Sequence, residues 1–102
     1  MEGLKQFLAS HVNICSLSID LAAEIVGVSP RTLQRYLMKQ GSTYTILIDE
    51  ICFKLSREMM LDKNLSITEI AFELGYSDVA HFSRAFRRIT GLSPRSYRRQ
   101  IL

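Results

Sequence analysis

The chain has 102 residues, 47% of them apolar, and a formal net charge of +3. This length suffices for one compact unit with a buried core but not for two large domains. No apolar run approaches the ~18 residues of a membrane span, and the first residues lack the basic and apolar stretches of a signal peptide. We therefore expect a cytoplasmic protein with no membrane partner.

The charges are divided unevenly along the chain. Residues 1–78 carry seven basic and ten acidic side chains, a net charge of −3, whereas residues 79–102 carry six arginines and no acid. A merely solvated surface usually mixes both signs. An unopposed group of arginines therefore favours a phosphate-bearing or otherwise polyanionic partner.

Three short helices are predicted before Gly41, because apolar residues recur at helical spacing with no long period-two alternation. Ser18 is placed to cap the second of them. Ser29 is placed to cap the third, with Pro30 at its first position, where a missing N–H costs nothing. The expected core positions of the first two helices are Leu4, Phe7, Leu8, Val12, Leu21, Ala22 and Ile25.

A longer helix is predicted from about residue 43 to about residue 61. At ~1.5 Å per residue its roughly 19 residues span about 28 Å. A continuous rod of this length could hold the segments at its two ends apart. Its expected core positions are Leu47, Ile48, Ile51, Leu55 and Met59.

Three further helices complete a prediction of seven. Residues 66–69 form a capping box that opens the fifth helix. Ser77 or Asp78 caps the sixth, and residues 93–94 repeat the Ser-Pro start for a short last helix. The aromatic residues here lie at helical spacing beside aliphatic ones, so we expect core packing rather than base stacking. The expected core positions are Tyr76, Phe82, Phe86, Ile89 and Tyr97.

An internal repeat appears when the chain is shifted by 49 residues against itself. Each copy reads as a short helix, a turn and a capped helix, and the small Ala22 and Ala71 allow two steeply crossing helices to approach closely. We predict two helix-turn-helix subdomains, residues 1–41 and 63–102, joined by a linker helix over 42–62. The other aligned pairs are Leu21/Ile70, Glu24/Glu73, Ile25/Leu74, Leu33/Phe82, Arg35/Arg84, Leu37/Phe86 and Lys39/Arg88.

Donor-rich, acid-free faces are predicted on the third and sixth helices. A rotation of 100° per residue turns these faces outward once the leucines and phenylalanines of the same helices are buried. Arginine can pair with guanine, glutamine with adenine, and small apolar groups with a thymine methyl. The expected base contacts are Arg31, Thr32, Gln34, Arg35, Val79, Ala80, His81, Ser83 and Arg84. The expected phosphate contacts are Lys39, Arg87, Arg88, Arg95, Arg98 and Arg99.

Two runs in the second half form a long and specific pattern. They read Ile67-x-x-Ile70-Ala71-x-x-Leu74-Gly75-Tyr76 and Phe82-Ser83-Arg84-x-Phe86-Arg87-Arg88-x-x-Gly91-Leu92-Ser93-Pro94-x-x-Tyr97-Arg98. This pattern resembles the C-terminal signature of the AraC/XylS family of bacterial transcription regulators. The first half is similar to the family's more variable first unit, so the resemblance covers roughly residues 18–99.

The resemblance implies an all-α, homeodomain-like fold whose third and sixth helices read double-stranded DNA. It also implies a separate N-terminal effector or dimerisation domain in the full protein, and it makes RNA polymerase a second candidate partner. In the family an arginine often stands where this chain has Cys52, and an alanine where it has Ser56.

Two other classes of function are alternatives to DNA binding. A helical protein-interaction module could bind an acidic partner through the arginine face. An enzyme is not expected, because no nucleophile motif, glycine-rich phosphate loop or carboxylate pair accompanies the Ser, His and acidic residues. No cofactor or metal is expected either. Cys15 and Cys52 have no Cys-x-x-Cys spacing or nearby His, so we expect reduced thiols that pack as small apolar residues.

Overall fold

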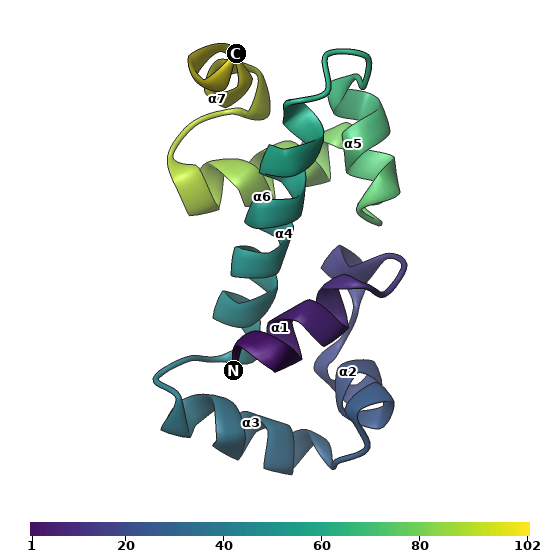
Figure 1. Ribbon diagram of the computed structural model, residues 1–102, viewed down its shortest axis with the longest axis vertical. Coiled ribbons are helices and arrows are strands. Elements are labelled where there is room, and N and C mark those ends of the chain that lie inside the picture. The colour runs from purple at the N-terminus through teal and green to yellow at the C-terminus, as the bar shows by residue number, and fades with distance from the viewer.

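Seven α-helices and one short 3₁₀ helix make up the protein, and α4 joins its two ends (Figure 1). The computed structural model describes all 102 residues and contains no strand. The predicted all-α, seven-helix architecture is confirmed. No helix combines the length and apolar character needed to cross a bilayer. In chain order the elements are α1 (Glu2–Ala9), η1 (Ile14–Ser16), α2 (Ile19–Val26), α3 (Pro30–Lys39), α4 (Tyr44–Met60), α5 (Ile67–Glu73), α6 (Val79–Thr90) and α7 (Pro94–Ile101).

The helices begin at the capping residues that the sequence indicates. Ser66 accepts a hydrogen bond from the Glu69 N–H at 3.0 Å, and the Glu69 carboxylate accepts one from the Ser66 N–H, which completes the predicted capping box. Of the two candidates at α6, Asp78 is the cap, since its carboxylate accepts from the His81 N–H at 2.7 Å. Three further serines cap as predicted: Ser18, Ser29 and Ser93.

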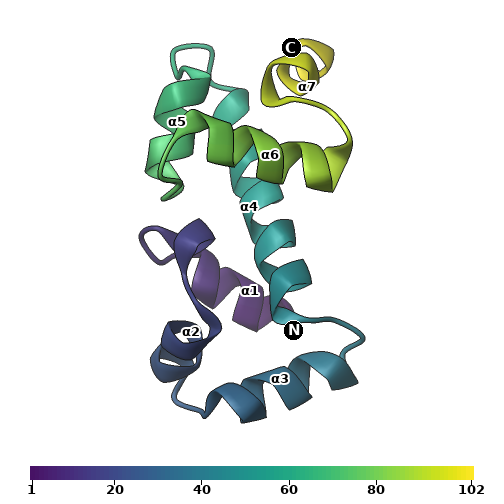
Figure 2. The same ribbon diagram turned by 180° about the vertical axis from the view of Figure 1, so that it is seen from behind.

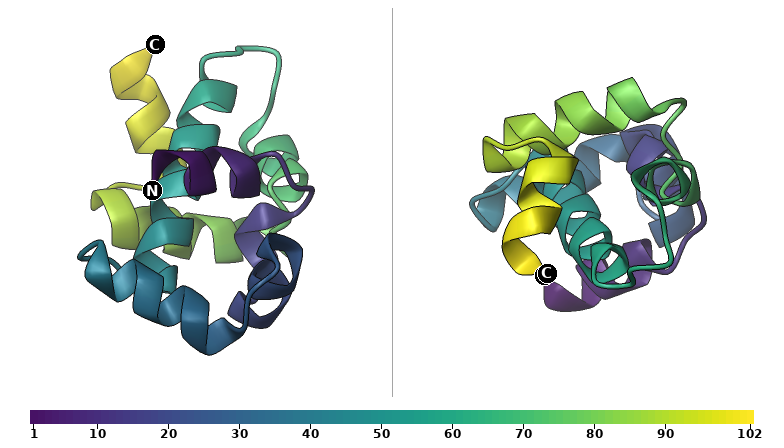
Figure 3. Two further views of the ribbon diagram at one scale, coloured as in Figure 1. Left: turned by 60° about the horizontal axis from the view of Figure 1, so that its bottom comes forward. Right: turned by 90° about the horizontal axis from the view of Figure 1, so that it is seen from above.

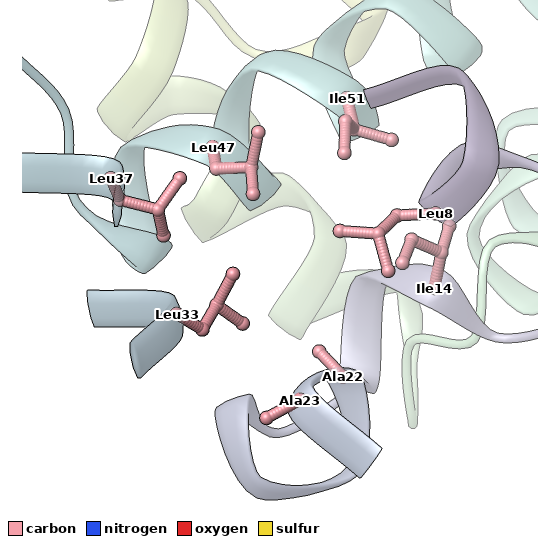
Figure 4. Close-up of a cluster of buried hydrophobic side chains, with 8 residues drawn as sticks. All are labelled: Leu8, Ile14, Ala22, Ala23, Leu33, Leu37, Leu47 and Ile51. Atoms are coloured by element: carbon pink, nitrogen blue, oxygen red, sulfur yellow. The ribbon is translucent and has the colours of Figure 1, made fainter. Parts of the chain in front are cut away.

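The first hydrophobic cluster fills the space between α1, η1, α2, α3 and the start of α4, which together we call the first unit (Figure 4). Ala22 is completely buried, so α2 can pack closely on α3 as the small residue predicts. The leucines of α3 point from the other side toward the same centre. The cluster consists of Leu8, Ile14, Ala22, Ala23, Leu33, Leu37, Leu47 and Ile51.

The second cluster lies between α5, α6, α7 and the end of α4, which we call the second unit. Aromatic rings pack against one another within it: the Phe86 ring centroid lies 5.7 Å from that of Phe82 and 5.2 Å from that of Tyr97. The expected core packing of these rings is confirmed. Its buried members are Met60, Ile70, Ala71, Leu74, Tyr76, Phe82, Ala85 and Phe86. Whether the predicted subdomain boundaries mark independent domains stays a prediction.

Several expected core positions are in fact exposed. The first helix ends at Ala9, and Val12 lies outside it with 84% of its surface exposed. The reason is local: the Ser10 hydroxyl and the His11 ring both bond the Phe7 carbonyl, so side chains take the place of the next helical turn. Leu21 is likewise 52% exposed, because the completely buried Ala22 and Ala23 form the contact face of α2.

The buried face of α4 also differs from the prediction. It is rotated toward Cys52 and Ser56, while Ile48, Leu55 and Met59 are only half-buried. The Ser56 hydroxyl avoids the cost of burial by donating to the Cys52 carbonyl at 2.5 Å. The rotation lets one helix serve both hydrophobic clusters.

A disulfide joins Cys15 and Cys52, and the expectation of two reduced thiols was wrong. Cys15 lies in η1 and Cys52 in α4, with their Cα atoms 5.9 Å apart. The two positions are 37 residues apart in sequence, so no local spacing indicates the bond. It depends on the packing of η1 against α4, which only the tertiary structure shows.

The segment around η1 also contacts the second unit, and we call this junction the seam. The Cys15 N–H donates to the Leu74 carbonyl at 3.3 Å. Gly75 has φ +97°, and a Cβ there would lie 2.7 Å from the Asn13 Cα. A side chain at Gly75 would thus be strained by the backbone and would also collide with the first unit.

Candidate nucleic-acid interface

The two helices predicted to read DNA lie on the same side of the molecule. Figure 2 shows α3 and α6 running across the view in the same direction, with α6 in front of α4. The view along the long axis shows α3 beyond α6 on the same side of α4 (Figure 3, right). The two helices therefore do not point apart, and one surface can present both.

The outer face of α3 carries the predicted donors. Arg31, Gln34 and Arg35 are exposed and, with Pro30 and Met38, line a shallow hollow along the helix. Leu33 and Leu37 are buried on the opposite side, as the helical wheel predicts.

The remaining predicted contacts of α3 lie at its two ends. Thr32 is exposed at the start, where its hydroxyl oxygen accepts a hydrogen bond from Ser29 at 2.9 Å. Lys39 is exposed in the last turn. The structure therefore places every predicted α3 residue at the surface.

The outer face of α6 is smaller and partly recessed. Ala80 and Arg84 are exposed, whereas Val79 and Ser83 are half-buried. His81 is exposed, but its ring packs edge-on against the Tyr76 ring with centroids 5.2 Å apart, and Nδ1 lies 3.4 Å from the Ser77 hydroxyl.

Three of the predicted phosphate ligands in the second unit have no partner within the chain: Arg87, Arg95 and Arg99. The other two are engaged. Arg88 donates to the Asp49 carboxylate at 2.8 Å. Arg98 donates to the carbonyls of Met60 and Asp62, at 3.0 and 2.6 Å, which binds α7 to the end of α4. Both arginines therefore position helices, and a DNA phosphate could bind them only alongside these partners within the chain.

A crevice of about 190 Å³ lies between the two units beside α6. Cys15, Asp49, Tyr76, His81 and Arg88 are among its lining residues. Burial raises the pKa of the Tyr76 hydroxyl; the nearby Asp49 carboxylate raises this pKa further, and Arg88 opposes the rise. The crevice thus contains an ion pair and a neutral phenol next to the disulfide.

Two features beside this surface were not expected from the sequence. One is Asp49, whose ion pair fixes α6 to α4; only the tertiary contact reveals it. The other is a hollow of about 400 Å³ between α3 and the start of α4, where Thr43 and Thr45 lie beside Gln34 and Met38. The start of a helix at Thr43 was predicted. The spacing of residues in the sequence could not show that this helix start lies close to α3.

Comparison with known proteins agrees with this geometry. A family profile described as a helix-turn-helix domain matches residues 22–100. The ornithine utilization regulator of Pseudomonas aeruginosa is 36% identical over 80 residues, which is 78% of this chain and 24% of that protein. The transcriptional regulator GlxA of Rhizobium meliloti is 39% identical over 79 residues, 76% of this chain and 24% of that protein. The chain thus spans about a quarter of the length of these curated relatives.

Solved structures give the same result. The C-terminal domain of AraT, a response regulator from Geobacillus stearothermophilus, superposes with a TM-score of 0.82 at 32% identity, covering 97% of this chain and 83% of that one. An AraC-type transcriptional regulator from Chromobacterium violaceum superposes with a TM-score of 0.80 at 28% identity, covering 95% and 87%. With its two matching helix-turn-helix units, this chain belongs to the AraC/XylS family of transcription regulators and forms the family's DNA-binding domain.

Proposed function

We propose that the chain binds double-stranded DNA sequence-specifically, with α3 and α6 entering two adjacent major-groove segments on one side of the duplex. One observation carries the proposal: both helices present exposed, acid-free donor faces on the same side of α4. The 17 residues of α4 span about 25 Å, the same order as the ~34 Å groove repeat. One polypeptide could therefore do what a dimer of single helix-turn-helix units does.

The α3 face is proposed to supply most of the base recognition. Arg31 and Arg35 can each donate two hydrogen bonds to guanine O6 and N7, and Gln34 can pair with adenine N6 and N7. Thr32 lies at the edge of this face, where its hydroxyl can reach a base or a phosphate.

The α6 face offers one strong base reader, Arg84, and smaller groups around it. Ala80 and Val79 can touch a thymine methyl, and Ser83 can bond either a donor or an acceptor. His81 is held by its own unit, so we assign it a contact at the groove edge.

Phosphate contacts are proposed for the cations that have no partner within the chain. These are Lys39 at the end of α3 and Arg87, Arg95 and Arg99 in the second unit. Arg88 and Arg98 contribute positive charge near the backbone while they hold α6 and α7 in place. Such contacts fix the register of the protein on the duplex without reading its sequence.

The cellular setting is proposed from the family. A cytoplasmic regulator acts on the chromosome, and its relatives are about three times as long as this chain. We propose that a full-length regulator joins this domain to an N-terminal effector or dimerisation domain, and that RNA polymerase is a further partner. We assign no catalytic activity to the domain.

The test is selection of bound duplexes from a random DNA pool, followed by titration at several salt concentrations. We expect one enriched sequence with two conserved blocks. The logarithm of the association constant should fall with the logarithm of salt concentration by roughly 0.9 per phosphate contact. Equal affinity for enriched and random duplexes would overturn the proposal and would favour the alternative, an acidic protein partner bound by the arginine face.

A further inference from the structure

We propose that Cys15 and Cys52 form a redox modification site whose disulfide holds the two units in the arrangement that reads DNA. This inference rests on the proposed two-groove binding. It assigns the cysteines a regulatory role: oxidation favours binding to the complete operator, and reduction weakens it.

The disulfide lies in a segment that contacts both units. Cys15 belongs to η1, and its side chain packs against both hydrophobic clusters. Its own N–H is bonded to the Leu74 carbonyl at the end of α5. The neighbouring Asn13 lies against Gly75, in the turn between α5 and α6. One short segment therefore contacts both units.

The covalent bond adds α4 to these contacts. Cys52 is 2% exposed in the middle of α4, and the bond fixes η1 against that helix. Apart from this bond, the segment around η1 contacts the second unit through one hydrogen bond of 3.3 Å and through van der Waals contacts. Without the bond, the seam depends on weak contacts that can open locally.

The two sulfur atoms differ in access. Cys15 is half-buried and lines the crevice of about 190 Å³ between the units, which is open to solvent. Cys52 is buried. A small oxidant or a reducing thiolate can therefore reach Cys15 first, and Cys52 serves as the resolving residue.

Hydrogen peroxide is the oxidant class that fits this opening. The Cys15 thiolate attacks one peroxide oxygen, the O–O bond breaks, and a sulfenic acid and hydroxide form. The Cys52 thiol then attacks the Cys15 sulfur; the S–O bond breaks, the disulfide forms, and water leaves with the proton of Cys52. In sum, two thiols and one peroxide give a disulfide and two waters.

Reduction reverses the bond with a protein dithiol of the thioredoxin class. One of its thiolates attacks the Cys15 sulfur, the S–S bond breaks, and Cys52 leaves and takes up a proton. The second thiol of the reductant then releases Cys15. In the cytoplasm proposed above, disulfides are rare and usually transient, which favours a reversible site over a permanent brace.

The consequence for binding follows from the geometry. A reduced chain samples arrangements in which α3 and α6 no longer fit two successive grooves. Its apparent affinity for DNA is the affinity of the fitting arrangement multiplied by the fraction of molecules in that arrangement. We expect about a tenfold loss on an operator with both blocks, which corresponds to matching about one tenth of the time. A duplex with one block scrambled should be bound equally well in both redox states.

The binding test uses the whole chain, titrated with peroxide or dithiothreitol, with the redox state confirmed by mass. The probes are the selected duplex and the same duplex with one block scrambled. The Cys15→Ser chain is the control and should show no redox response. Equal affinity of oxidised and reduced chain for the two-block duplex would overturn the inference.

A second readout does not require DNA. Amide hydrogen exchange of Cys15 should quicken at least tenfold on reduction, whereas that of Ile70, held within α5, should stay unchanged. Unchanged exchange at Cys15 would overturn the inference even if the chain binds DNA. If no duplex is enriched, the proposed function fails, and this exchange measurement still decides whether the disulfide controls the seam.

Discussion

The two units share one helical hairpin but differ in what fills it. The first is packed with aliphatic side chains, of which Ala22, Leu33 and Leu37 are almost completely buried. The second is packed around aromatic rings, with Phe86 in contact with three of them. The same backbone plan therefore accepts two different cores when the small alanine on the first hairpin helix is kept.

The two units also differ in how they carry charge. The α3 face combines two arginines with a glutamine, a set suited to reading bases. The second unit carries six arginines, of which two are engaged in holding helices. The difference suggests a division of labour in which the first unit recognises and the second anchors.

The largest effect is expected in the aromatic core. Phe86→Ala should lower the free energy of unfolding by about 3–5 kcal/mol, because it removes a 2% exposed ring and leaves a cavity among its neighbours. Urea denaturation measures this loss in the free energy of unfolding. Phe72→Ala is the control, since that ring is 56% exposed and its loss should change stability by no more than about 0.5 kcal/mol. Similar losses from both variants would show that the second cluster does not carry the stability of its unit.

Reduction of the disulfide should give the next largest effect. The bond closes a loop of 37 residues, and reduction should lower the unfolding free energy by about 2–4 kcal/mol. Urea denaturation with and without dithiothreitol measures the loss. The Cys15→Ser chain should be insensitive to the reductant. A wild-type chain whose stability does not respond to dithiothreitol would contradict the assignment of the bond.

The division between recognition and anchoring predicts unequal losses of specificity. Arg35→Ala should reduce discrimination between the selected and a random duplex by about 1–3 kcal/mol. Arg99→Ala should weaken both duplexes alike and lower the salt dependence by about one contact. Arg57→Ala, on the exposed surface of α4, serves as the charge-matched control. Equal specificity losses from Arg35→Ala and Arg99→Ala would remove the distinction between the units.

The smallest effect concerns alkaline pH. Burial raises the pKa of Tyr44 to about 12, above the ~10 of an unfolded chain. The Tyr44 hydroxyl therefore keeps its proton to a higher pH in the folded state than in the unfolded state. Its contribution to the free energy of unfolding is fully present below about pH 10 and is lost as the pH rises from about 10 to about 12. Burial also raises the pKa of Tyr76, so each unit contributes to this loss.

Tyr44→Phe should flatten part of that alkaline fall. The variant also loses the hydrogen bond from the Tyr44 hydroxyl to the Leu17 carbonyl at 2.8 Å, so it should be less stable at neutral pH as well. Unfolding measured at about pH 9 and about pH 11 separates the two effects. An unchanged slope in the variant would show that Tyr44 titrates normally in the folded chain.

Local signals account for most of what could be predicted from the sequence. Capping residues such as Ser29 and Asp78 indicate where a helix begins, because their side chains accept hydrogen bonds from backbone N–H groups three residues further along. The buried residues of α3 and α6 follow from helical spacing in the same way. Family resemblance and the internal repeat then assign both helices to one binding surface.

What the sequence could not show includes contacts between distant residues and side-chain bonds that end a helix. Cys15 and Cys52 have no local sign of pairing, since η1 meets α4 only after the chain has folded. Asp49 pairs with Arg88, 39 residues away, so this expected phosphate ligand also positions α6. Val12 fits the apolar period of α1, but side-chain bonds to the Phe7 carbonyl end that helix first.

The most direct test of the account is methylation interference on the selected duplex, which reports the guanine N7 atoms that the protein must approach. Two helices held on one face of α4 predict two patches of interference about one helical turn, or ~10 base pairs, apart on the same side of the DNA. Arg35→Ala should erase part of one patch and Arg84→Ala part of the other. A single patch, or two patches on opposite sides of the duplex, would contradict the account.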